Sequence, residues 1–282
     1  MPLNYKSSYK ERARKRNLLI IIGIVAVCLI AATVIIFTKK PAGGLAGDDH
    51  SGEYGKVIER QKLYLYTVGT PRVSPSDVNR EYTKVDKQVE DSYFDDALFI
   101  GDSRTEGFML YTSLSNIKAY CSKGLSISRI YEDKIVTLED GRTVTVMDAL
   151  QEEKYKKIYI MFGVNELGWP YDDLFIEQYT KLLHDVKQLE PDAIIYVENI
   201  IPVSAARSAT DPIYNNDNVR HFNEMVEQVC KDQNVVYLDV ASALAGPDGA
   251  LPANASTDGV HCNKEYCEVW LNYLKNNTYE IN

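Results

Sequence analysis

The sequence is poor in the residues that build metal centres and small disulfide scaffolds. It has 4 His and 5 Cys in 282 residues, and no CxxC pair or His/Cys cluster suggests a zinc site. Cys28 falls in a long apolar run, whereas Cys121, Cys230, Cys262 and Cys267 lie beyond it. The spacing of these four resembles no small disulfide scaffold. Cys262 and Cys267 are close enough in sequence to pair, and four buried thiols fit the sequence equally well.

Positive charge is concentrated at the start of the chain. Residues 1–40 hold eight Lys/Arg and one Glu, a charge of +7, and the whole chain carries −9, so the remainder carries −16. A strongly acidic remainder repels phosphates, which argues against nucleic acid as a partner. The composition, 45% hydrophobic and 25% charged, is typical of a chain that folds.

Long uncharged runs are also rare, and the sequence suggests one membrane span. Residues 18–37 are twenty residues without a charge, enough to cross a hydrocarbon core of roughly 30 Å as a helix. Six positive residues precede the run and two follow it, which predicts a cytoplasmic basic tail at 1–17 and residues 41 onward outside. A cleaved signal peptide usually has a shorter apolar region, so an uncleaved single-pass anchor is favoured over cleavage near Ala46.

The rest of the chain predicts a linker followed by one folded domain. We expect residues 38–92 to be a linker and pre-domain segment, with a short strand at 62–68 and a stretch from residue 77 that wraps the domain surface. The domain is expected to cover residues 93–282.

Short continuous apolar runs predict five strands of this domain, at 97–101, 116–122, 156–163, 192–200 and 235–240. Helical spacing predicts helices at 173–189, 218–232 and about 263–275, and the pair Asp140-Gly141 predicts a hairpin within 134–146. Strands that alternate with helices predict a three-layer α/β/α sandwich around a five-stranded parallel sheet.

Residues suited to acyl transfer follow four of the predicted strands. Ser103 follows the first, Gly124 the second and Asn165 the third, while Asp258 and His261 follow the fifth. Sites in open parallel sheets form beyond the carboxyl ends of the strands, so these residues are expected to share one edge. His261 can accept the serine proton, and Asp258 can hold the imidazole in the required tautomer. The N–H groups of Ser103 and Gly124 and the amide of Asn165 are candidate oxyanion donors.

Each of the segments that contain these candidate residues is, taken alone, typical of an ordinary turn or helix cap. Together the segments resemble a known family. GDSR, Gly124, GVNE and DGVH are similar to the four sequence blocks of the SGNH (GDSL) hydrolase superfamily, in the family order. The resemblance covers about residues 93–276. It implies a flavodoxin-like sandwich with Ser103 as nucleophile, His261 as base and Asp258 as its partner. The segment before GDSR resembles membrane-anchored or secreted members from Gram-positive bacteria.

Two residues depart from the family pattern. Arg104 stands where the family has leucine, and Glu166 stands where it has aspartate. We expect Arg104 either to contact substrate or to pair with an acid such as Glu166, and the pairing is favoured. Trp169 and Tyr171 follow Asn165 closely, where they can stack on a sugar, line an acyl pocket or pack against the protein.

The sequence therefore predicts an anchored, extracytoplasmic serine esterase. Its expected substrates are O-acetyl or similar short acyl esters of cell-envelope or extracellular glycans, cleaved through an acyl-enzyme without metal or organic cofactor. An O-acetyltransferase on wall polysaccharide uses the same triad and would need an envelope partner to supply the acyl donor. A lipase or a thioesterase also fits. A non-catalytic binding module is disfavoured because all three triad residues are present.

Overall fold

The computed structural model describes residues 80–282. The predicted membrane span at 18–37 and the predicted strand at 62–68 lie outside these residues. Within the described part, no helix combines the length and the hydropathy that crossing a membrane requires.

A five-stranded parallel sheet forms the centre of the domain, in the order β3-β2-β6-β7-β8. Its strands are β2 (Ala97–Gly101), β3 (Lys118–Cys121), β6 (Lys157–Met161), β7 (Ile194–Glu198) and β8 (Val236–Leu238). Each lies within the apolar run that predicted it. Every residue of β2 is buried, as expected for a strand covered on both faces.

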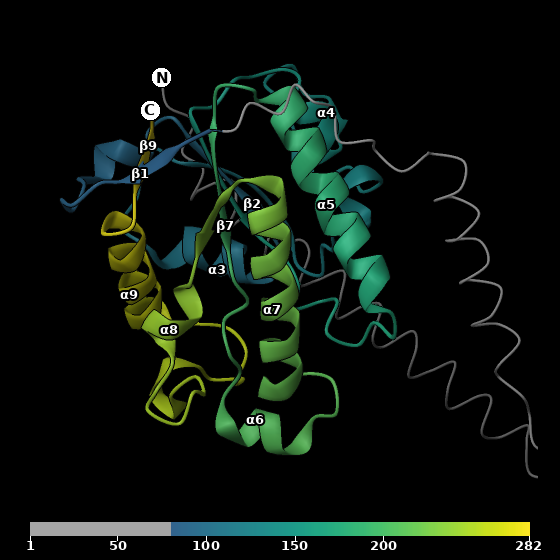
Figure 1. Cartoon of the computed structure of the whole chain (residues 1–282), viewed down its shortest axis with the longest axis vertical. Helices are drawn as coiled ribbons and strands as arrows, with labels where there is room; N and C mark the ends of the chain where they lie inside the picture. The colour runs from purple at the N-terminus through teal and green to yellow at the C-terminus, as the bar shows by residue number, and fades with distance from the viewer. Residues whose placement is uncertain (1–79) are drawn as a thin grey trace, which may run out of the picture. The chain divides into compact units, whose positions relative to one another are not determined.

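Helices cover both faces of this sheet, so the predicted three-layer sandwich is confirmed. On one face α5 (Asp172–Leu189) and α7 (Asn216–Gln233) pack side by side (Figure 1). The short α4 (Val146–Ala149) contributes to the same hydrophobic core. On the other face lie α3 (Ser103–Tyr111), α8 (Val240–Leu244) and α9 (Lys264–Lys275). Strand side chains alternate between the layers. In β2, for example, Leu98 and Ile100 join the α5/α7 core, whereas Phe99 joins the α3/α9 core.

Aromatic rings build the core beneath α3 and α9. Tyr159 stacks between Phe99 and Tyr196, with ring centroids 4.6 and 4.5 Å apart. Phe108 of α3 packs against Trp270 of α9 at 4.6 Å. Such pairs contribute roughly 0.5–1.5 kcal/mol each beyond the burial of their area. This packing fixes the position of α3, whose first residue is a candidate site residue.

The folded domain begins earlier than the predicted limit at residue 93. Strand β1 (Tyr82–Lys84) pairs antiparallel with β9 (Tyr279–Ile281), close to the C-terminus (Figure 1). The N–H of Val89 donates to the carbonyl of Lys275, and the Arg80 guanidinium donates to the carbonyl of Ala193. Residues 80–92 are therefore bound to the domain, in agreement with the expectation that the stretch from residue 77 wraps its surface, and the folded part extends beyond the predicted limit.

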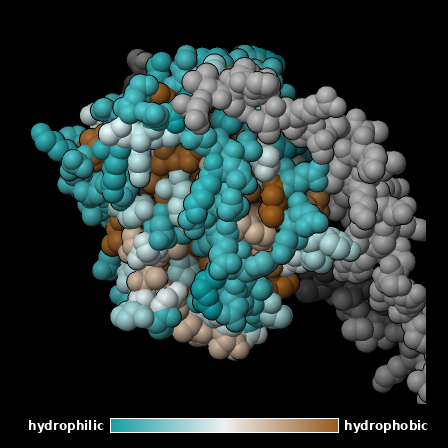
Figure 2. Space-filling model, viewed as in Figure 1, coloured by the Kyte–Doolittle hydropathy of each residue, from teal (hydrophilic) through white to brown (hydrophobic). Residues whose placement is uncertain are grey.

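Shorter elements connect the main layers. The predicted hairpin is present as β4 (Val136–Thr137) and β5 (Thr143–Val144). The remaining elements are η1 (Asp91–Phe94), η2 (Arg129–Tyr131), α6 (Ala205–Thr210) and η3 (Ala253–Ala255). The face of the domain in Figure 2 is mainly hydrophilic, and its hydrophobic residues gather in small, separate groups.

Candidate active site

Ser103 is placed by a tight turn from β2 into α3. A Cβ added at Gly101 would lie 2.1 Å from Thr105 Oγ1 and 2.8 Å from the carbonyl oxygen of Met161, so only glycine fits at the strand end. Asp102 caps the helix, because its Oδ1 accepts a hydrogen bond of 2.8 Å from the N–H of Arg104. Ser103 is thus the first helical residue, at the carboxyl edge of the sheet.

The structure brings Ser103, His261 and Asp258 into one hydrogen-bonded chain. Ser103 Oγ lies 2.8 Å from His261 Nε2, and His261 Nδ1 lies 2.6 Å from Asp258 Oδ2. A serine that donates to Nε2 requires the imidazole proton on Nδ1, where it can donate to the carboxylate. The two partners come from the loop between η3 and α9, and both side chains remain partly open to solvent.

The environment of Asp258 favours its ionised form. Its Oδ1 accepts from the N–H groups of Val260 and His261, at 2.8 and 2.9 Å, and from Ser256 Oγ at 3.0 Å. Partial burial alone would raise its pKa, but the hydrogen bonds from the backbone and ring of His261 and from Val260 outweigh this and hold the pKa well below its ordinary value. The carboxylate is therefore charged and can stabilise an imidazolium.

Two of the three expected oxyanion donors, Gly124 and Asn165, lie on two loops that are hydrogen-bonded to each other. Asn165, after β6, donates from Nδ2 to the carbonyl of Leu125 at 2.8 Å. Glu166 accepts from the N–H of Ile127 through Oε1 at 2.7 Å. Two consecutive side chains thus hold the loop that carries Gly124, whose φ of +74° favours glycine. Nδ2 of Asn165 bears a second proton that remains for a ligand.

Two carboxyl groups are buried next to this constellation. Burial raises the pKa of Asp102 to about 6, although the N–H and the charge of Arg104 partly offset the effect. Burial also raises the pKa of Glu166 to about 8, and the charge of Asp102 adds to the increase. Glu166 is therefore mainly protonated at neutral pH, and its structural hydrogen bond from Ile127 does not require a charge.

Arg104 does not occupy the position expected of a substrate contact. Its side chain is buried, with 3% of the residue exposed, so it is not positioned to bind substrate. Its Nε donates to the carbonyl of Val260 at 3.2 Å and its Nη1 to the carbonyl of Ile201 at 2.5 Å. The hydrogen bonds of the guanidinium go to backbone carbonyls and not to Glu166, and the acid whose charge acts on it most strongly is Asp102. An arginine is usually expected at a surface, and the sequence contains no sign of this burial.

The other predicted residues occupy varied surroundings. Trp169 is partly buried and packs against the α5/α7 core. Tyr171 directly precedes α5 and is 49% exposed, so it remains accessible on the loop that begins near Asn165. Cys262 and Cys267 are buried free thiols and form no disulfide with each other.

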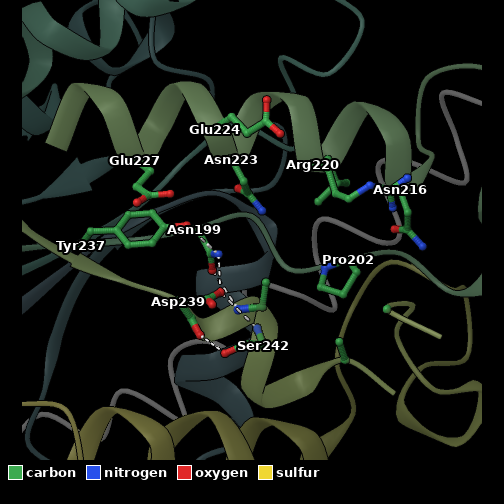
Figure 3. A pocket seen from close by; sticks show the side chains of 14 residues that line it. Asn199, Pro202, Asn216, Arg220, Asn223, Glu224, Glu227, Tyr237, Asp239 and Ser242 are labelled. Atoms are coloured by element: carbon green, nitrogen blue, oxygen red, sulfur yellow. Dashed lines mark hydrogen bonds between the residues drawn. The ribbon is translucent and has the colours of Figure 1, made fainter. Parts of the chain in front are cut away.

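A groove of about 310 Å³ lies between α7, α8 and the ends of β7 and β8 (Figure 3). Its asparagines are engaged in internal hydrogen bonds. Asn223 bonds both the N–H and the carbonyl of Ile200, at 2.7 and 2.9 Å. Asn199 donates to Asp239 Oδ1 at 2.7 Å and to the Tyr237 hydroxyl at 3.0 Å. These amides hold the segment after β7 in place, and the triad is not part of the groove.

A serine, histidine and aspartate linked at the carboxyl edge of a parallel sheet form the catalytic triad of a serine hydrolase. The chain belongs to the GDSL-like lipase/acylhydrolase family, whose sequence model matches residues 99–266. No curated protein matches the sequence.

Several solved structures are similar to this chain at low sequence identity. A protein from Streptococcus pneumonia, described as a candidate platelet activating factor, is 16% identical with a TM-score of 0.51, over 78% of this chain and 97% of that chain. A GDSL-like lipase from Bacteroides thetaiotaomicron is 15% identical with a TM-score of 0.49, over 67% and 89%. An acetylxylan esterase from Geobacillus stearothermophilus is 18% identical with a TM-score of 0.45, over 64% and 92%.

Proposed function

We propose that the protein hydrolyses short acyl esters through Ser103, His261 and Asp258. The observation that carries the proposal is the unbroken hydrogen-bonded chain from Ser103 Oγ to Asp258 Oδ2. A serine hydroxyl becomes a competent nucleophile when a base accepts its proton, and this arrangement supplies the base and the group that orients it.

In the proposed first step, Ser103 Oγ forms a bond to the ester carbonyl carbon while its proton moves to His261 Nε2. The tetrahedral intermediate places negative charge on the former carbonyl oxygen. The N–H groups of Ser103 and Gly124 and the second Nδ2 proton of Asn165 are its proposed donors. The bond to the alcohol then breaks, the alcohol oxygen takes the proton from Nε2, and an acyl-enzyme remains.

The second step returns the enzyme to its starting state. A water molecule gives a proton to His261 Nε2 and attacks the acyl carbon. Ser103 Oγ then leaves and takes the proton back, which releases the carboxylic acid. Asp258 stays ionised throughout and stabilises the imidazolium in both steps, in agreement with its lowered pKa.

The proposed substrate is an O-acetyl or similar short acyl ester on a cell-envelope or extracellular glycan. The accessible ring of Tyr171, on the loop that begins near Asn165, suits a carbohydrate because aromatic rings stack on sugar faces. The uncharged run at 18–37 supports anchoring by a single span, with the domain outside the cell.

Acetate release tests the proposed activity and its substrate class. Full-length protein and its Ser103→Ala variant, each solubilised in detergent, are incubated with acetylated and with chemically de-acetylated wall glycan. We expect acetate only from the acetylated glycan and only with the unchanged protein. A series of nitrophenyl esters should show declining turnover from acetate to longer chains, and a preference for long chains would indicate a lipase instead.

Two further measurements test the alternatives that concern transfer and location. A sugar acceptor added with the ester should not be acetylated faster than water reacts, since preferential transfer would indicate an O-acetyltransferase. Protease added to intact cells should remove the domain, and full protection would contradict the proposed orientation.

A further inference from the structure

Arg104 connects two parts of the site that are far apart in the sequence. It follows Ser103 at the start of α3, and its guanidinium reaches Val260, the residue before His261. We propose that Arg104 is a positioning residue that fixes the loop carrying Asp258 and His261 against the start of α3. The proposal rests on the proposed function, because it assigns a role in the same reaction.

The guanidinium contacts two backbone segments at once. Nε donates to the carbonyl of Val260 at 3.2 Å, and Nη1 donates to the carbonyl of Ile201 at 2.5 Å. The planar guanidinium directs its donors at fixed angles, so the two contacts also fix the segments relative to each other. The N–H of Ser204 donates to the carbonyl of Gly259 at 2.8 Å, which links the same two segments a second time.

The burial of these groups makes the contacts costly to lose. Ile201 is fully buried and Val260 is 9% exposed, so their carbonyls depend on the protein for hydrogen bonds. A leucine at position 104, the residue that the family pattern has there, carries no donor and would leave both carbonyls unpaired. The loop would then be free to move to a position in which Val260 finds another partner, and His261 would move with it.

A displaced imidazole affects the chemical step more than binding. The Ser103 Oγ to His261 Nε2 distance of 2.8 Å suits proton transfer, and misplacement of a reacting group by about 1 Å can cost on the order of 100-fold in rate. Arg104 itself is too deeply buried to contact substrate. For variants of Arg104 we therefore expect a loss in kcat with little change in KM.

The test compares Arg104→Leu and Arg104→Lys with Val229→Ala in the full-length protein. Val229 lies on α7, and its apolar side chain makes no hydrogen bond, so its truncation destabilises the fold without removing a hydrogen bond of the loop. For Arg104→Leu we expect kcat on an acetyl ester to fall about 10- to 100-fold at unchanged KM. Lysine can reach one carbonyl and should restore part of the rate. Val229→Ala should keep its kcat at a comparable melting temperature.

Hydrogen–deuterium exchange gives a readout that does not depend on turnover. The N–H groups of Val260 and His261 are protected by Asp258, so a peptide covering residues 256–264 reports the loop. We expect faster exchange there in both Arg104 variants and not in Val229→Ala.

Unchanged exchange, a change in KM alone, or a loss of kcat no larger than that of Val229→Ala would overturn the inference. If Arg104→Leu does not fold, Arg104→Lys decides by the same criteria. An inactive wild-type protein would contradict the proposed function while the exchange data still decide the role of Arg104.

Discussion

Ser103 Oγ and His261 Nε2 lie 2.8 Å apart, although 158 positions separate the two residues in the sequence. One is the first residue of a helix that the strand β2 positions, and the other belongs to a loop beyond the last strand of the sheet. Their contact depends on the whole domain, so the site and the fold are expected to be lost together on unfolding.

Asp258→Asn should lower kcat by roughly 10³- to 10⁴-fold, with the fold intact. The amide that replaces the carboxylate cannot stabilise an imidazolium and favours the wrong tautomer of His261. Asp192→Asn, an exposed acid at the start of the loop before β7, is the matched control and should keep full activity. A variant Asp258→Asn with more than a tenth of the original kcat would contradict the role of Asp258.

Asn165→Ala should lower kcat by about 10²- to 10³-fold, the usual cost of removing one oxyanion donor. The effect on KM should be small, since the charge on the oxygen develops only in the transition state. Steady-state kinetics on a nitrophenyl acetate separates the two parameters. A change confined to KM would mean that Asn165 binds the ester but does not stabilise the oxyanion.

Gly259→Ala and Gly141→Ala should differ although both glycines have positive φ, +79° and +88°. At Gly141 an added Cβ meets open space, so the cost is about 1–2 kcal/mol of backbone strain. Gly259 belongs to the loop that carries His261, and a Cβ there would lie 2.5 Å from Ser204 Oγ. Catalytic activity should therefore fall in Gly259→Ala as well as stability. Thermal melts and kinetics measure both effects, and equal behaviour of the two variants would refute the steric argument.

Glu198→Gln should flatten the dependence of stability on pH. Burial raises the pKa of Glu198 from 4.5 to about 8, although a hydrogen bond of 2.5 Å from Trp270 Nε1 lowers it in part. Between these two pH values the folded state therefore binds more protons than the unfolded state. The stabilising contribution of the protonated Glu198 is complete below pH 4.5 and declines as the pH rises to about 8. Denaturant melts from pH 4 to 9 test this, and an identical slope in wild type and variant would count against a buried, neutral Glu198.

The sequence was sufficient for the elements whose patterns are local. Continuous apolar runs located the five strands, and helical spacing located α5, α7 and α9. The carboxyl edge of a parallel sheet then brought Ser103 and His261 together without further information. The same reasoning could not detect β1 and β9, because neither is a continuous apolar run and their pairing joins the two ends of the domain.

The burial of ionisable side chains also could not be predicted from the sequence. Arg104 and Glu198 are residue types that usually lie at the surface, and only the packing around them determines their burial. The partners of Arg104 are backbone carbonyls, which every residue has, so no side-chain pattern marks them. Short helices such as α6 and α8 carry too few residues for a periodic signal.

Covalent labelling of Ser103 tests the central claim most directly. Full-length protein, Ser103→Ala and His261→Gln are treated with a serine-directed fluorophosphonate, and the adduct is located by peptide mass spectrometry. The account predicts a single adduct on Ser103, strongly slowed labelling in His261→Gln, and no labelling or ester hydrolysis by Ser103→Ala. Labelling at another residue, or hydrolysis by Ser103→Ala at the rate of the unchanged protein, would contradict it, and an unlabelled protein without esterase activity would indicate a binding module that keeps the fold.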